Sequence, residues 1–256
     1  MFGPDCIAAI RRHAMEAHPR ESCGAVVAGS YLPLPNMLPD EPASPGAPSA
    51  RDAFDFDERL VLQYGADLQA LVHSHPDGPA YPSLKDQIGQ LSWALPWGIT
   101  VSTKASATVP FWWGDGTPRL PYLEPRGFHW IVNDCYSLIR DAFRQEHGIT
   151  LKDFPREWGA WRRTPENPQG FSGYIEHFKA GGFVKVDDPQ PWDLGVLKFG
   201  TKAPSHAGIY LGRNLFLHHL SDDESPVAPY LLSRRVPLGN WRKYIDHGGF
   251  WLRYAR

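Results

Sequence analysis

Residues 68–86 read LQALVHSHPDGPAYPSLKD, and this stretch decides the fold of the first half of the chain. Its opening segment, Leu68–Ser74, is mostly apolar and predicts a buried strand that runs straight into a His-Pro turn. Ser83 can cap a helix that continues to Leu95, because Asp86 follows three residues later as in a capping box. The stretch therefore predicts a strand, a turn and a capped helix in direct succession.

The segments on either side extend this pattern into an α/β domain over residues 1–113. A helix is expected over residues 4–18, a proline-rich surface loop over 33–48, and buried strands over 24–29, 99–101 and 109–113. Residues 114–127 are rich in proline and glycine and are interpreted as a linker.

The second half, residues 128–256, has a different order of elements. A helix is expected over residues 133–147, where Gly148 marks its end, and three short strands follow over 194–199, 206–211 and 215–220. A helix followed by consecutive strands predicts an α+β domain and not a βαβ unit. The chain as a whole is therefore expected to be α+β, with two domains.

The composition excludes several classes of protein. The 256 residues carry a net charge of −2, which gives no reason to expect binding to nucleic acid or to an anionic membrane. No apolar run approaches the roughly 18 residues of a membrane span, and the charged start does not suit a signal peptide. The acidic run Asp222, Asp223 and Glu224 is interpreted as a solvated turn, with a metal site as the alternative.

His73 and His75 end the first buried strand and suggest a zinc site. Residues two apart on a strand point to the same face, so both imidazoles can approach one metal ion, and Asp86 can supply an oxygen ligand. Three protein ligands leave a fourth position for water, which is typical of catalytic zinc, and Glu21 is the candidate base for that water. The alternative is that the two histidines are ordinary polar residues at a loop edge.

Cys135 lies at the start of the strongest predicted helix and is the candidate nucleophile of a second site. His206 could serve as its base, and His218, twelve residues later on the next strand, could orient that histidine. The helix dipole and a charged histidine should lower the pKa of the thiol below the roughly 8.5 of free cysteine. The alternative is a small buried cysteine and a solvated histidine.

The first pattern resembles the JAMM (MPN) family of zinc metallopeptidases over residues 1–113. The matching positions are His73-x-His75, Ser83-x-x-Asp86 and the segment Arg20-Glu21-Ser-Cys-Gly24. The resemblance implies a Zn²⁺ ion bound by His73, His75 and Asp86. It also implies Glu21 as general acid/base, Ser83 as support for the tetrahedral intermediate, and cleavage of peptide or isopeptide bonds.

The second pattern resembles the papain-like NlpC/P60 cysteine peptidases over about residues 126–256. Asn133-Asp-Cys135-Tyr-Ser-Leu-Ile-Arg-Asp141 is similar to the nucleophile helix of that family, and His206-Ala-Gly-Ile-Tyr-Leu-Gly212 to its histidine strand. His218 then matches the third catalytic residue. Trp192-Asp193 stands where the family commonly has Gly-Asp, and Tyr136 replaces the common serine, but no catalytic group is lost.

The two motifs in this order resemble the lambda-like K family of phage tail-tip assembly proteins. The resemblance implies that the NlpC/P60 half hydrolyses amide bonds in peptidoglycan stem peptides during genome entry. The JAMM half would act on a tail partner, a ubiquitin-like tail protein being one candidate. The protein would lie in the virion tail tip, and in the host cytoplasm during assembly. The alternative is a structural plug or assembly factor without turnover.

Overall fold

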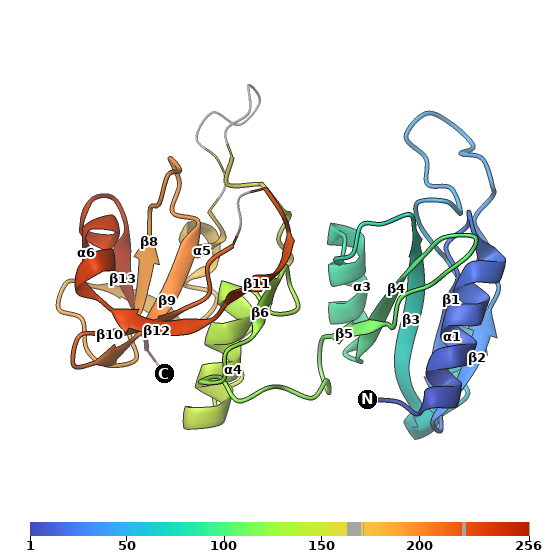
Figure 1. Ribbon diagram of the computed structural model, residues 1–256, viewed down its shortest axis with the longest axis horizontal. Coiled ribbons are helices and arrows are strands. Elements are labelled where there is room, and N and C mark those ends of the chain that lie inside the picture. Colours follow the sequence, from blue (N-terminus) through green and yellow to red (C-terminus); the bar gives the residue numbers. More distant parts are fainter. Residues whose placement is uncertain (163–169, 171, 222–223, 256) are drawn as a thin grey trace. The chain divides into compact units, whose positions relative to one another are not determined.

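The computed structural model describes residues 1–162, 170, 172–221 and 224–255. Asp222 and Asp223, and so most of the expected acidic turn, lie outside the described residues. The chain divides into two compact units, Met1–Pro118 and Arg119–Arg256, each with its own sheet and helices (Figure 1). Within the described ranges no helix is both long and apolar enough to cross a membrane.

The N-terminal unit is built on a five-stranded sheet in the order β2-β1-β3-β4-β5, in which only β3 and β4 run parallel. Its elements are α1 (Pro4–Ala17), β1 (Cys23–Val27), β2 (Ser30–Leu34), α2 (Arg59–Leu62), the 3-10 helix η1 (Gly65–Asp67), β3 (Leu68–Pro76), α3 (Leu84–Trp93), β4 (Trp97–Ser102) and β5 (Phe111–Trp113). The predicted helices and strands are present, and β2 is an additional strand that runs into the start of the expected loop.

Strand β3 places the two histidines on the face of the sheet away from α1. Ala70 and Val72 pack with Cys6 and Ile10 of α1 in one buried cluster. Because side chains alternate across a strand, the odd-numbered residues His73 and His75 point to the opposite face. Helix α3 covers that face (Figure 1).

The C-terminal unit contains a six-stranded antiparallel sheet in the order β12-β10-β9-β8-β13-β7. Its elements are β6 (Gly127–His129), α4 (Cys135–His147), α5 (Gly173–His177), β7 (Phe183–Val186), β8 (Leu194–Leu197), β9 (His206–Gly212), β10 (Leu215–His218), β11 (Val227–Leu232), β12 (Arg234–Pro237), α6 (Gly239–Asp246) and β13 (Phe250–Tyr254). Strands β6 and β11 form a separate pair.

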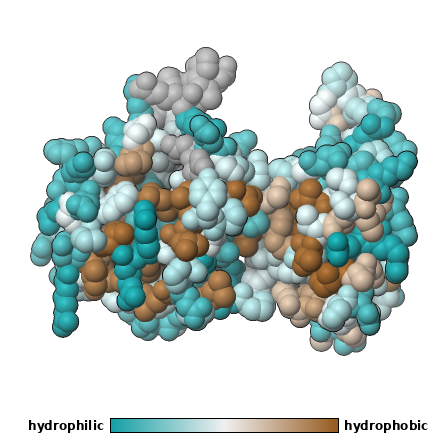
Figure 2. Space-filling view, viewed as in Figure 1, coloured by the Kyte–Doolittle hydropathy of each residue, from teal (hydrophilic) through white to brown (hydrophobic). Residues whose placement is uncertain are grey.

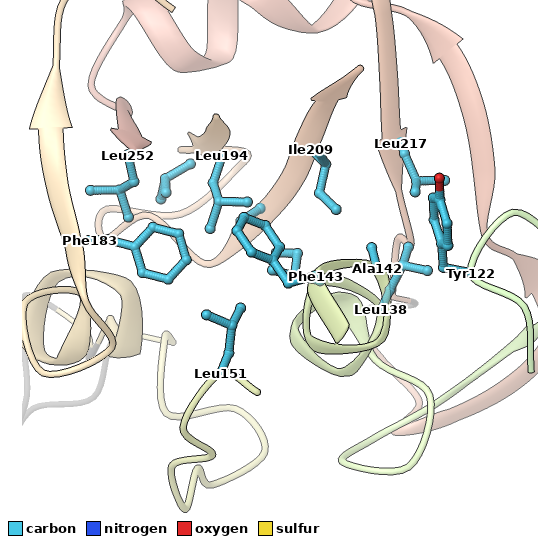
Figure 3. Close-up of a cluster of buried hydrophobic side chains, with 13 residues drawn as sticks. Tyr122, Leu138, Ala142, Phe143, Leu151, Phe183, Leu194, Ile209, Leu217 and Leu252 are labelled. Atoms are coloured by element: carbon cyan, nitrogen blue, oxygen red, sulfur yellow. The ribbon is translucent and has the colours of Figure 1, made fainter. Parts of the chain in front are cut away.

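The two faces of this sheet are covered by different helices. On one face Leu138 and Phe143 of α4 pack with Leu194, Ile209 and Leu252 of three strands (Figure 3). On the other face Ile245 of α6 packs with a second cluster formed by Leu197, Phe216, Leu238 and Trp251. Exposed apolar side chains are scattered over the surface in view (Figure 2), as on most soluble domains.

Helix α4 has clear signals at both ends. The Asp134 side chain caps it by accepting a hydrogen bond from the Ser137 amide, and Gly148 ends it in the left-handed region with φ 66°. These two signals explain why the helix expected from the sequence agrees with the observed α4. They also make Cys135 the first helical residue.

The position of α4 should depend on Phe143, which is 2% exposed at the centre of its cluster. Phe143→Ala should lower the free energy of unfolding of the C-terminal unit by about 3 to 5 kcal/mol, because it deletes a buried ring and leaves a cavity. Urea unfolding followed by tryptophan fluorescence measures this. Leu123→Ala, at a side chain 42% exposed in the same unit, is the control and should cost about 0.5 kcal/mol. Equal costs would mean that α4 is not held by this core.

Candidate functional sites

The predicted zinc ligands come together at the end of β3. One nitrogen or oxygen atom from each of His73, His75 and Asp86 lies within 4.8 Å of the others, and all three residues are buried. The two Nε2 atoms are 3.0 Å apart, and they lie 3.2 and 3.4 Å from the two carboxylate oxygens of Asp86. Two imidazole nitrogens and one carboxylate around one point make a suitable donor set for zinc.

The ligands are oriented by their outer contacts. The Nδ1 of His75 lies 2.6 Å from the Pro79 carbonyl, which can only accept, so Nδ1 carries the proton and Nε2 presents its lone pair. Asp86 Oδ2 accepts a hydrogen bond from the Ser83 amide, while Ser83 Oγ accepts one from the Asp86 amide. This capping box holds the carboxylate in place, so the structure gives Ser83 a role at the start of α3.

Glu21 lies beside this cluster and lines the same pocket as His75, Ser83 and Asp86. Its segment is fixed to β3 because the Ser22 amide donates to Ser74 Oγ and the Ser74 amide donates to the Ser22 carbonyl. Burial raises the pKa of Glu21 to about 8, while the charge of His75 opposes the rise and that of Asp86 adds to it. Glu21 can therefore hold a proton near neutral pH.

Asp134 and Arg156 fix the turn that presents Cys135. Asp134 has no exposed surface, and its carboxylate accepts hydrogen bonds from the amides of Ile131 and Ser137. Arg156 Nη2 lies 2.8 Å from the same carboxylate, and Arg156 also bonds Asp153. Ile131 adopts φ 69°, an unusual value for a β-branched residue. The hydrogen bond from its backbone amide to the Asp134 carboxylate holds that conformation.

His206 and His218 meet across the hairpin of β9 and β10. The Nε2 of His206 lies 3.2 Å from Nδ1 of His218, and both rings are buried. His218 pairs directly with Gly208, where a Cβ atom would come within 2.5 Å of the Leu217 carbonyl, so only glycine fits. His219 lines the pocket shared by Cys135 and His206, and its Nε2 lies 2.9 Å from the Leu231 carbonyl, so the ring contact with His206 is made by His218.

Cys135 lies beside His206 and close to a residue that the sequence did not single out. Cys135 and His206 line one pocket, and the amide of Ala207, next to His206, hydrogen-bonds the sulfur. The hydroxyl of Tyr174 on α5 lies 3.3 Å from the Cys135 Sγ. Tyr174 and Arg156 were both missed because they lie in segments without periodicity or a recognisable motif.

The expected low pKa of Cys135 is wrong for this structure. Burial raises the pKa of the thiol to about 11, and the charge of Asp134 adds to the rise. Together they outweigh the hydrogen bonds from Tyr174 and Ala207 and the charge of Arg156, which lower the pKa. Burial also holds the pKa of His206 well below its usual range, so the histidine is neutral and cannot stabilise a thiolate by its charge. The two groups form a neutral pair, because desolvation disfavours both ions.

Burial lowers the pKa of His218 to about 4, with the charges of Arg234 and His219 adding to the effect. Because the pKa of His218 is lower in the folded than in the unfolded state, where it is about 6.5, the group's contribution to stability is fully present above pH 6.5. That contribution is lost as the pH falls toward 4. The C-terminal unit should therefore lose about 3 kcal/mol from this group over that range. His218→Gln should make the dependence shallower by this amount, while the lowered pKa values of His206 and His219 keep their own contributions, and His247→Gln, at an exposed position, should leave it unchanged. The measurement is the urea midpoint of each protein at several pH values. If the midpoint changes with pH equally in the wild type and both variants, the pH dependence does not come from His218.

Comparison with known proteins identifies both halves. The model for prokaryotic homologs of the JAB domain matches residues 4–114, and the NlpC/P60 family model matches residues 108–232. These matches confirm the predicted fold class and the order of the two domains. A solved structure of an NlpC/P60 family protein from Bacillus cereus ATCC 10987 is 14% identical, with 96% of this chain and 66% of that one covered. Its TM-score of 0.31 is too low to establish a common overall fold.

Two curated proteins align with most of the chain. Tail tip assembly protein K of Escherichia phage N15 is 31% identical over 247 residues, 92% of this chain and 89% of that protein. Tail tip assembly protein K of Escherichia phage lambda is 33% identical over 177 residues, 67% of this chain and 79% of that protein. With both domains present in the predicted order, the chain belongs to the phage tail tip assembly protein K family.

Proposed function

We propose that the C-terminal unit is a cysteine peptidase that hydrolyses an amide bond in the peptide stem of peptidoglycan. The observation that carries this proposal is the convergence of two buried histidines, His206 and His218, with the half-buried Cys135 at the start of α4. The matched NlpC/P60 family supports the reaction type. Hydrolysis of the stem would open the wall during genome entry.

In this reaction His206 acts as a base while the sulfur attacks, since the resting thiol and imidazole are both neutral. The Nε2–H of His206 donates to Nδ1 of His218, which leaves the lone pair of Nδ1 on His206 to accept the thiol proton. The sulfur then forms a thioester with the carbonyl carbon, and His206 returns the proton to the leaving amine. Water finally hydrolyses the thioester and frees Cys135.

We infer that the N-terminal unit is a zinc-dependent peptidase or isopeptidase acting on a tail partner. The facing Nε2 atoms and the capped Asp86 suit a divalent ion, and zinc bound there would supply a Lewis acid. Glu21 would accept a proton in its ionised form and return it at the same carboxyl group. The Ser83 hydroxyl accepts from the Asp86 amide, so its own hydrogen remains available to the oxygen of a tetrahedral intermediate.

The names of the two relatives support a place at the phage tail tip. The chain would be part of the virion, after assembly in the host cytoplasm. Its partners would be other tail-tip proteins, among them the substrate of the N-terminal unit, for which a ubiquitin-like tail protein is a candidate.

One observation favours the second candidate function, a structural plug without turnover. The Cys135 thiol is half-buried, its raised pKa of about 11 keeps it protonated at neutral pH, and Tyr174 lies against it. A building block that keeps its active-site residues for packing would have these properties. The two candidates differ in whether Cys135 turns over substrate.

Zinc content tests the N-terminal site. Protein purified without chelator should contain about one zinc per chain, and His75→Ala should lose most of it, because only two ligands remain. Elemental analysis measures this. His13→Ala is the control, because His13 bonds Tyr31 elsewhere in the unit, and it should retain the metal. Folded wild type without zinc would refute the metal site.

Digestion of purified peptidoglycan tests the C-terminal site. The wild type should release soluble stem peptides, and Cys135→Ala should reduce the release at least about a thousandfold, as loss of a nucleophile does elsewhere. Chromatography of the soluble products gives the rate. Cys6→Ala removes a buried thiol from the other unit and should digest as the wild type does. Equal digestion by wild type and Cys135→Ala would refute the cysteine peptidase assignment. No digestion by either protein would favour a structural plug without turnover.

A further inference from the structure

Tyr174 is held firmly against the reacting sulfur by contacts outside the predicted triad. The rings of Tyr174 and Tyr136 meet edge to face, with centroids 6.2 Å apart and an interplanar angle of 83°. The Tyr174 ring also packs against the main core of the unit. Ser172, two residues earlier, donates a hydrogen bond of 2.5 Å to the Pro204 carbonyl, just before β9. The phenol ring is therefore held by Tyr136 and the core, its segment is held by Ser172, and its hydroxyl oxygen lies 3.3 Å from Cys135 Sγ.

The chemistry of the pair decides the direction of this hydrogen bond during reaction. Burial raises the pKa of Tyr174 well above its usual range, so the phenol keeps its hydrogen at every pH at which the thiol can react. A thiolate has no hydrogen and can only accept. When Cys135 loses its proton, the Tyr174 hydroxyl must therefore be the donor.

We propose that Tyr174 is a further functional residue of the C-terminal site, whose hydroxyl donates a hydrogen bond to the Cys135 sulfur and stabilises the thiolate form. The inference rests on the proposed function in that the sulfur is taken as the nucleophile. With the Ala207 amide, the hydroxyl gives the developing anion two donors from two different segments. Hydrogen bonds to charged groups are about twice as strong as neutral ones, so the contact strengthens as charge develops.

The electrostatic surroundings leave this task to Tyr174. Of the residues that the structure describes, the ionisable groups that act on Cys135 or line a pocket with it are Asp134, Tyr136, Arg156, Glu157, Tyr174, His177, His206 and His219. Asp134 disfavours the thiolate, and the charge of Arg156 is shared with Asp134 and Asp153. Burial keeps His206 and His219 neutral. Tyr174 is thus the strongest side-chain contribution in favour of the thiolate.

Alkylation of the full-length protein tests the proposal, because the sign of the effect separates it from a merely structural role. Tyr174→Phe removes one atom beside the sulfur and opens access to it. If Tyr174 only shields Cys135, labelling by iodoacetamide becomes faster. If it stabilises the thiolate, labelling becomes slower, by about tenfold at a pH near 8, since less thiolate forms. Mass spectrometry of the Cys135 peptide gives the rate.

Tyr136→Phe is the matched control, because Tyr136 follows Cys135 directly but donates its hydroxyl to the Lys152 carbonyl. It should label at the wild-type rate. Should Tyr174→Phe fail to fold, replacement of all tyrosines by 3-fluorotyrosine keeps the ring shape and makes the hydroxyl a stronger donor. Cys135 should then label several-fold faster than in the wild type. An unchanged or faster rate in Tyr174→Phe, an equal slowing in Tyr136→Phe, or an unchanged rate with fluorotyrosine overturns the proposal.

These results stand apart from those that test peptidase activity. A slower-labelling Tyr174→Phe in a protein that digests no peptidoglycan would support the hydrogen bond and remove the peptidase assignment. A wild type that digests peptidoglycan, together with unchanged labelling in Tyr174→Phe, would support the peptidase assignment and refute the hydrogen bond.

Discussion

Asp134 is buried completely, and the arrangement of the C-terminal site depends on how its carboxylate is satisfied. One side chain caps α4, holds the unusual backbone of Ile131 and pairs with Arg156. A buried carboxylate is costly unless its partners stay in place, so removal of any one partner would disturb the others. Because Cys135 follows directly, the ion pair fixes where the helix starts and where the sulfur lies.

The two candidate sites use burial in different ways. At the end of β3, burial brings two imidazoles and a carboxylate so close that a divalent cation is the natural counter-charge. At the start of α4, burial holds Cys135, His206 and His218 in their neutral forms. The first site could therefore bind a metal ion, and in the proposed peptidase reaction the second would transfer a proton between groups that are neutral at rest.

The sequence predicted the parts of each site that lie within one or two elements. The spacing of His73 and His75 on a strand, the capping pattern of Ser83 and Asp86, and the twelve residues between His206 and His218 all reflect local geometry. These groups come together because strand alternation and hairpin pairing act over short distances. Strand β2 escaped prediction because Pro33 and the prolines that follow the strand suggested a loop, although an edge strand tolerates a proline.

The parts that the sequence did not predict depend on long-range packing. Tyr174 reaches Cys135 from 39 residues away, through a short helix fixed to the connection before β9. The pKa of Cys135 was mispredicted for the same reason, since the helix dipole can be recognised from the sequence but the degree of desolvation cannot. Local patterns thus predicted the candidate groups, and the tertiary structure determines their charge states.

The central claim is that the sulfur of Cys135 forms a covalent bond with the substrate, with His206 as its base. Rapid acid quenching during digestion of stem peptides, followed by mass spectrometry, tests this claim most directly. The account predicts a transient increase in mass on the Cys135 peptide, equal to the acyl part of the cleaved substrate and absent in His206→Ala. Cleavage of the substrate with no adduct on Cys135 at any time, and at an equal rate in His206→Ala, would contradict it.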